Sequence, residues 1–152
     1  LDQLADSLSH WQRQKANNND TYHFTTSPLV WSEEQPMPIS TLQIIDGTVS
    51  EQRYQLVHVN NPSLNTSHIT TLDNNPTLLY LKTVDDFYRQ CQDTLLSMQP
   101  DKQTLYFSLH ADGLLRECSA MDNDCTNCSE HVTITHISFV IALHCFHLPP
   151  VY

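Results

Sequence analysis

The sequence predicts one α+β domain in which helices pack on one face of an antiparallel sheet of about six strands. Apolar residues recur at helical spacing in two segments, and two Asp-Gly pairs each stand between β-prone runs. The predicted elements follow the order helix, three strands, helix, three strands. Strands joined by short turns run antiparallel, and an antiparallel sheet can bury one face under helices. A chain of 152 residues is long enough for one such domain.

The first half of the chain predicts one helix and three strands. Leu4, Leu8 and Trp11 recur on one face of the helix, which we expect to end at the Asn-rich stretch 17–20. A hairpin is predicted at Asp46-Gly47, because a type I′ turn needs residues that tolerate a positive φ. The three strands are predicted at residues 21–31, 41–45 and 48–57, with a proline-containing loop at 32–38.

The second half predicts another helix and three more strands. Residues 84–98 carry apolar side chains at helical spacing, and Thr83 is placed to cap this helix. We expect the helix to lie across the sheet, with Trp11 and the first helix packing at one end. Cys91 is expected to face the core as a free thiol. The strands are predicted at residues 105–110, 114–118 and 131–139.

Two segments do not fit this regular pattern. Residues 58–82 are weak in periodicity and rich in Asn, Thr and Pro, so they predict a long loop or insertion with a short strand at 78–81. This segment is either a decorated loop or the functional surface. Residues 140–152 contain Pro149-Pro150 and predict a C-terminal tail, which places the domain at residues 1–139.

The charge balance excludes two classes of partner. Seven Lys and Arg stand against 17 Asp and Glu, which gives a formal net charge of −10. A nucleic-acid or anionic-membrane binder needs a cationic face, and the seven basic residues are scattered along the chain. The sequence also contains no apolar run long enough to cross a bilayer. We therefore expect neither nucleic-acid binding nor a membrane span.

Glycine usage argues against nucleotide chemistry. The chain has only two glycines, and both stand in Asp-Gly pairs, so neither a P-loop nor a dinucleotide-binding Gly-rich turn can be present. The Gly-x-Ser-x-Gly motif of serine hydrolases is absent as well. The sequence therefore predicts a protein that is not an enzyme, with no catalytic residues and no cofactor.

Three of the five cysteines form a cluster that permits several chemistries. Cys118, Cys125 and Cys128 lie close together in the sequence, and His131 follows them. The main interpretation is a disulfide from Cys118 to Cys125 or Cys128. The alternative is a zinc or copper site formed by Cys118, Cys125, Cys128 and His131, with nearby histidines such as His144 as further ligands. A redox role is less favoured, because the Cys-x-x-Cys motif falls in a polar loop between strands.

The order of the elements and several short motifs resemble an uncharacterised bacterial family of small secreted or lipoprotein domains, the DUF6174 type. The residues that carry the resemblance are Trp11 in the first helix and the segments 20–24, 42–49, 83–88 and 132–139. The likeness spans roughly residues 4–139 and departs at the 58–82 segment, at the cysteine loop and in the tail. It implies an exported α+β domain and supplies no catalytic residues.

These observations predict a non-enzymatic exported domain that binds an unknown protein or small-molecule ligand through its sheet or its 58–82 segment. The location is periplasmic, cell-envelope or secreted. The sequence begins at Leu1 rather than Met, so we expect a processed N-terminus from which an export signal or a lipid-anchor residue has been removed. The alternative function is that of a small metal-binding protein.

Overall fold

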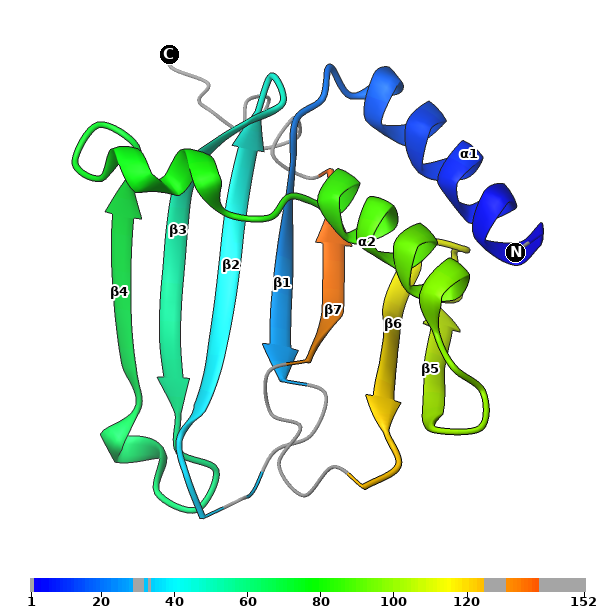
Figure 1. Ribbon diagram of the computed structural model, residues 1–152. Helices are drawn as coiled ribbons and strands as arrows, with labels where there is room; N and C mark the ends of the chain where they lie inside the picture. Colours follow the sequence, from blue (N-terminus) through cyan, green and yellow to red (C-terminus); the bar gives the residue numbers. More distant parts are fainter. Residues whose placement is uncertain (1, 29–31, 33, 125–130, 140–152) are drawn as a thin grey trace.

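The computed structural model describes residues 2–28, 32, 34–124 and 131–139. Two α-helices, seven strands and two short 3₁₀-helices follow one another along the chain (Figure 1). In order, they are α1 (Asp2–Asn17), β1 (Tyr22–Pro28), β2 (Met37–Ile45), β3 (Thr48–Val57), η1 (Pro62–Leu64), β4 (Thr66–Thr71), η2 (Pro76–Tyr80), α2 (Val84–Ser97), β5 (Gln103–Leu109), β6 (Leu115–Asp122) and β7 (Val132–Ser138).

The strands form two antiparallel sheets rather than one. The larger sheet has five strands in the order β4-β3-β2-β1-β7, and β5 and β6 form a separate two-stranded sheet. The α+β class and the antiparallel pairing are confirmed. The predicted single sheet of about six strands is replaced by two sheets, because β7 pairs with β1 and not with β6, its neighbour in the sequence.

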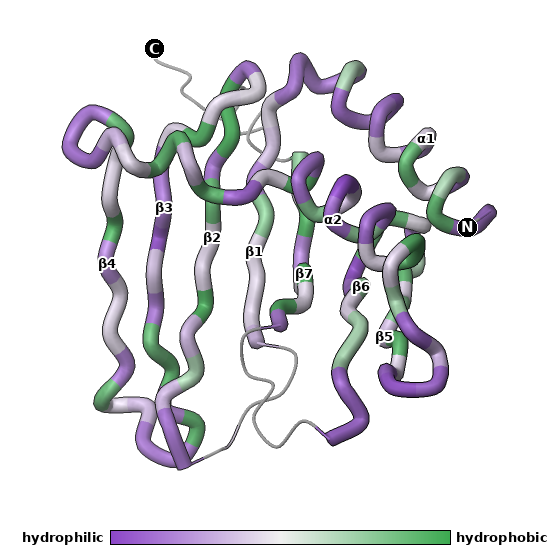
Figure 2. The backbone as a smooth tube through the Cα atoms, in the orientation of Figure 1, coloured by the Kyte–Doolittle hydropathy of each residue, from purple (hydrophilic) through white to green (hydrophobic). Residues whose placement is uncertain are grey.

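The helices pack on the strands as the pattern of apolar residues predicts. In Figure 1, α2 crosses in front of β7 and β6, and α1 lies at one end of the molecule. Trp11 of α1 is fully buried, with its ring edge-on to Tyr22 of β1 and stacked beside Tyr88 of α2. Figure 2 shows hydrophobic and hydrophilic residues interleaved along β1, β2 and β7, as expected for strands that bury one face.

The Asp46-Gly47 hairpin forms where the sequence predicts it. Asp46 has a φ of 50° and Gly47 a φ of 81°, so both residues lie in the left-handed region that a type I′ turn requires. Ile45 and Thr48 are paired directly across the turn. This turn determines the register at which β2 and β3 begin to pair, although a bulge follows between Gln43 and Ile44.

The 58–82 segment contains more structure than its sequence pattern indicates. Strand β4 occupies Thr66–Thr71, where no strand was expected, because an exposed edge strand carries little apolar alternation. The short strand predicted at 78–81 is wrong, since residues 76–80 form the 3₁₀-helix η2. Pro76 supplies the fixed φ of a first helical residue, and the Asn75 side chain accepts a hydrogen bond from the Thr77 N–H.

Two further predictions are corrected or left open. Strand β2 begins at Met37, inside the predicted loop 32–38, because residues 37–40 all pair with β3, and Ser40 also pairs with Thr26 of β1. The predicted C-terminal tail, residues 140–152, lies outside the described residues. Within the described part of the chain, no helix has both the length and the apolar character needed to span a membrane.

Candidate functional site

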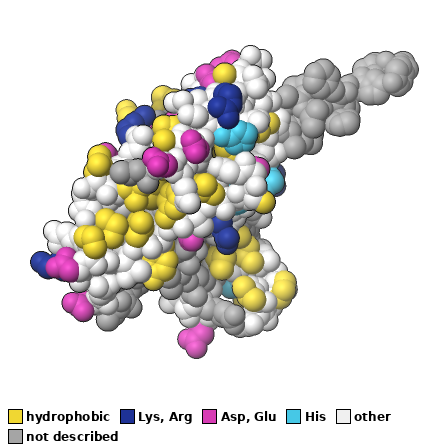
Figure 3. All heavy atoms as spheres, turned by 90° about the vertical axis from the view of Figure 1, so that its right-hand side faces the viewer, with side chains coloured by type: hydrophobic (Ala, Val, Ile, Leu, Met, Phe, Trp, Pro, Cys, Tyr) yellow, Lys and Arg dark blue, Asp and Glu magenta, His cyan; other side chains and the backbone are white. Residues whose placement is uncertain are grey.

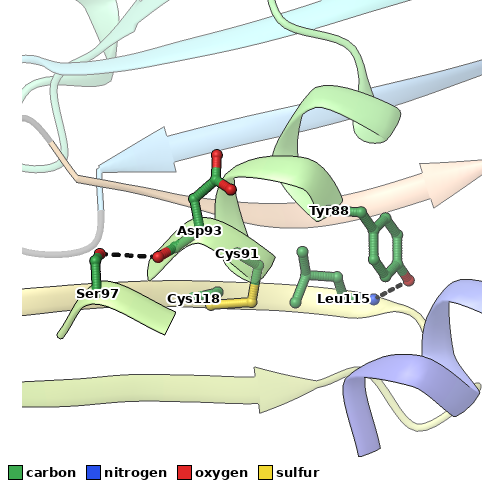
Figure 4. The surroundings of a disulfide bond; sticks show 6 residues. All are labelled: Tyr88, Cys91, Asp93, Ser97, Leu115 and Cys118. Atoms are coloured by element: carbon green, nitrogen blue, oxygen red, sulfur yellow. Dashed lines mark hydrogen bonds between the residues drawn. A yellow bond between two sulfur atoms is a disulfide. The ribbon is translucent and has the colours of Figure 1, made fainter. Parts of the chain in front are cut away.

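A disulfide bond joins helix α2 to the two-stranded sheet. Cys91 of α2 and Cys118 of β6 are bonded, with their Cα atoms 5.5 Å apart and 27 positions between them in the sequence (Figure 4). Cys91 lies in the core as expected, but the expectation that it is a free thiol is wrong. Cys118 is disulfide-bonded as predicted, but its partner is Cys91 and not Cys125 or Cys128. Helix α2 crosses directly over β6, and no local pattern in the sequence predicts this crossing.

A seam runs between β6 and β7 beneath α2. The two strands lie next to each other, yet no hydrogen-bonded ladder joins them. A cavity of about 60 Å³ opens along this seam, which we call the seam pocket. Its polar lining includes Lys82, Arg116 and His131, and its apolar lining includes Phe87, Leu115 and Ile134.

Side chains, rather than a ladder, hold the walls of the seam pocket in place. The Tyr88 hydroxyl accepts a hydrogen bond from the Leu115 N–H at 2.9 Å, as drawn in Figure 4. On the other wall, the Nε2 atom of His110 lies 2.7 Å from the Ile134 carbonyl oxygen. A carbonyl can only accept, so the ring nitrogen donates. These two contacts tie the β5–β6 hairpin to α2 and to β7, respectively.

Positive charge gathers at the seam pocket although the whole chain is strongly acidic. The ion pairs within the described residues involve other bases, namely Lys15 with Asp85 and Arg89 with Asp86. Arg116 has no carboxylate partner in this part of the chain. Lys82 also lacks one.

The lining of the seam pocket holds two cations, Lys82 and Arg116, against one carboxylate, Glu117. Lys82 donates from Nζ to the Gln90 side-chain oxygen at 3.0 Å and stands 5.9 Å from the centre of the Phe87 ring. Glu117, the carboxylate in the lining, accepts a hydrogen bond from the Ser108 hydroxyl of β5 at 3.0 Å. The arrangement is suited to a ligand that brings its own negative charge.

Two of the residues predicted to bind metal lie close together in the structure. Cys118 and His131 both line the seam pocket. Cys118 is committed to its disulfide, however, so it cannot act as a thiolate ligand, while Cys125, Cys128 and His144 lie outside the described residues. In the part of the chain that the structure describes, no three His, Cys, Asp or Glu side chains are grouped to hold a metal ion.

Sequence reasoning did not identify the two cations of the pocket. Lys82 precedes α2 and Arg116 lies in β6, so neither forms a motif with the other. Only the composition pointed to them: basic residues are rare in this chain, so each of the seven was a candidate for binding a negatively charged ligand.

A second hollow is also a candidate binding site. It lies between α1 and β5, measures about 480 Å³ and is lined by Asp6, His10, Phe107 and Asp112 among others. Figure 3 shows the side of the molecule on which β5 lies, where hydrophobic side chains gather and charged ones are scattered around them. This hollow is wider and more open than the seam pocket, and its carboxylates, Asp6 and Asp112, disfavour an anionic ligand.

Comparisons with protein-family models, with curated proteins and with solved structures find no match to this chain. The resemblance to the DUF6174 type of family therefore stays a prediction.

Proposed function

We propose that this protein is a non-enzymatic, exported domain that binds a small organic carboxylate in the seam pocket. The observation that carries the proposal is the convergence of Lys82, Arg116 and His131 on one cavity in a chain of net charge −10. A planar guanidinium binds a carboxylate through two parallel hydrogen bonds, and a lysine beside it adds a second positive charge.

The size and lining of the pocket limit the ligand. A cavity of about 60 Å³ is far smaller than the roughly 300–1,000 Å³ of a typical ligand pocket, so it admits only a small group such as a carboxylate head and excludes a nucleotide or a sugar chain. Phe87, Leu115 and Ile134 provide apolar contact for a short tail. A short-chain fatty acid or a small keto acid has this combination of charge and apolar surface.

The pocket lacks the geometry of an activated nucleophile. Ser119 and His131 both line it, and these are nucleophile and base types. No hydrogen bond joins the two side chains within the described residues, whereas nucleophilic catalysis needs the base within reach of the hydroxyl. We therefore infer that the seam pocket binds its ligand without chemically converting it.

The disulfide supports the exported location. Disulfides persist in secreted and periplasmic proteins and are rare in the reducing cytosol. To test this, protein taken directly from its native cells is alkylated under denaturing conditions without reduction. If the Cys91–Cys118 disulfide is intact and neither cysteine is alkylated, the result supports export. Alkylation of both cysteines without prior reduction would contradict it.

The ligand class is tested with butyrate and its neutral isostere butyramide. Isothermal titration and thermal melts should show binding of butyrate and none of butyramide. Arg116→Gln should weaken butyrate binding by about tenfold or more, because a charge-assisted pair is lost. The matched control is Arg53→Gln, which removes the same charge from the exposed Arg53 of β3, remote from the pocket lining.

Two results would reject the proposal. One is equal binding of butyrate and butyramide, which would mean that charge does not matter. The other is the same loss of affinity in Arg53→Gln as in Arg116→Gln, which would mean that only the overall charge of the protein matters.

A further inference from the structure

We propose that the outer edge of β4 pairs with β4 of a second copy of this chain, so that two molecules form one continuous antiparallel sheet. Strand β4 is the outermost strand of the five-stranded sheet and pairs with β3 on one side. In Figure 1 it forms the left margin of the sheet. Among the described residues, no segment pairs with its outer edge.

The sequence of β4 has none of the features that protect a free edge. Natural edge strands carry Lys, Pro, inward-pointing charges or bulges that prevent pairing with another chain. The residues of β4 are Thr66-Ser67-His68-Ile69-Thr70-Thr71, which contain no Lys, acidic residue, Pro or Gly. All six pair with β3 without a register shift. The strand is therefore regular and β-prone, and its backbone is available for pairing.

The direction of the backbone groups follows from one hydrogen bond. The Leu72 N–H donates to the Ser50 carbonyl at 2.9 Å, so Leu72 and Ser50 form a hydrogen-bonded pair of the β3–β4 ladder. In an antiparallel ladder such pairs alternate along the strand. The N–H and C=O groups of Ser67 and Ile69 and the N–H of Thr71 therefore point outward, away from β3, whereas the Thr71 carbonyl already accepts from the N–H groups of Asn74 and Asn75.

This alternation selects the register of the dimer. Two copies related by a twofold axis can place Ile69 opposite Ile69, with Ser67 opposite Thr71 on either side. Hydrogen bonds then form between the two Ile69 residues and from each Thr71 N–H to the Ser67 carbonyl of the other copy, and the two Ile69 side chains, each 49% exposed in the monomer, cover each other. An isologous contact of this kind closes on itself and gives a dimer.

Charge favours this edge over other surfaces of the molecule as the point of contact. Two copies repel each other, because each has a net charge of −10. The β4–β4 contact brings together only uncharged backbone and the side chains of Thr, Ser, Ile and His. The opposite margin of the molecule is less suitable, since β5 follows Asp101 and Lys102 and has the acidic hollow beside it.

The contact is small, so the dimer is expected to be weak. Pairing of one strand buries less than the roughly 1,200 Å² of a standard stable interface, so dimerisation should be seen only at high protein concentration. Added salt should strengthen the dimer, because it screens the repulsion between the two acidic molecules.

Sedimentation velocity over a wide range of protein concentration tests the proposal. The wild-type chain should show a monomer–dimer equilibrium. Ile69→Lys should raise the dissociation constant at least about tenfold, because it places two like charges directly opposite each other. Ile69→Pro should have the same effect, because it removes the outward N–H at the centre of the contact and leaves the hydrogen bonds to β3 intact. If either variant fails to fold, the other still decides the question.

The control is Tyr106→Lys, which adds the same charge to a side chain of β5 that is 42% exposed. This variant should dimerise as the wild type does. A wild-type chain that stays monomeric at all concentrations would overturn the proposal. So would an Ile69→Lys variant that dimerises normally, or a Tyr106→Lys variant that alone loses the dimer. None of these readouts depends on ligand binding in the seam pocket.

Discussion

At the scale of single residues, Tyr88 connects three elements. Its hydroxyl lies 2.7 Å from the Ser7 hydroxyl of α1 and accepts the Leu115 N–H of β6, while its ring packs beside Trp11. Burial raises the pKa of the Tyr88 hydroxyl, although both hydrogen bonds oppose the shift. One side chain therefore holds α1, α2 and β6 together, and the cost of its ionisation keeps it neutral at ordinary pH.

Replacing Tyr88 with Phe should destabilise the protein by about 1–3 kcal/mol, because the Leu115 N–H and the Ser7 hydroxyl lose a partner in a buried place. The free energy of unfolding in urea measures the effect. Tyr106→Phe is the control, since this exposed tyrosine should lose its hydroxyl at almost no cost. Equal losses in the two variants would show that the buried hydrogen bonds contribute nothing specific.

At the scale of elements, two adjacent carboxylates anchor the start of α2 in different ways. Asp86 accepts hydrogen bonds from the Thr83 N–H at 2.8 Å and from the Thr83 hydroxyl, which caps the helix. Asp85 instead accepts from the Trp11 ring nitrogen at 2.9 Å and pairs with Lys15. Asp86 therefore completes the cap that Thr83 was predicted to form, whereas Asp85 links α2 to α1.

The capping contact predicts a pH dependence. Burial alone would raise the pKa of Asp86, but hydrogen bonds from Thr83 and Arg89 lower it below its ordinary value of 3.8. A lowered folded-state pKa stabilises the protein above the ordinary value, and this stabilisation is lost as the pH falls through the folded-state value. Asp86→Ala should therefore cost about 1 kcal/mol at neutral pH and close to nothing in strong acid.

Urea unfolding at neutral and at strongly acidic pH measures this difference. Asp101→Ala is the matched control, because Asp101 is exposed and makes no side-chain hydrogen bond within the described residues. A cost for Asp86→Ala that persists unchanged in acid would show that its charge is not involved.

At the scale of the whole molecule, side chains rather than backbone pairing join the two sheets. No ladder joins β6 to β7, so the β5–β6 hairpin is held by the burial of Leu114 and Leu115 in the common core, by the Cys91–Cys118 disulfide and by the hydrogen bonds of Tyr88 and His110. The seam pocket opens between these links. Its geometry therefore depends on the disulfide remaining intact.

Removal of the disulfide by the double substitution of Cys91 and Cys118 to Ala should destabilise the protein by about 2–4 kcal/mol. Local opening should concentrate in β5 and β6, because these strands lose their covalent link to α2. Amide hydrogen exchange should therefore accelerate there more than in β1, β2 and β3. Uniform acceleration across both sheets would contradict this view.

Much of the local structure could be predicted from the sequence. The start of α2 after Thr83, the strand at 48–57 and the Asp46-Gly47 hairpin all form as expected. Strand β4 was not predicted, because an exposed edge strand needs no alternation of apolar and polar residues. The candidate site could be predicted only in part, since Cys118 and His131 were singled out and the basic residues Lys82 and Arg116 were not.

By itself, the sequence determined both α-helices, most of the strands and the Asp46-Gly47 turn, because helical periodicity, caps and hairpin residues act between neighbours a few positions apart. Only the tertiary structure decided that β7 pairs with β1, that Cys91 meets Cys118, and that Lys82 and Arg116 share one cavity. These contacts join residues far apart in the chain. Their geometry depends on how α2 packs across the strands, which no local pattern in the sequence specifies.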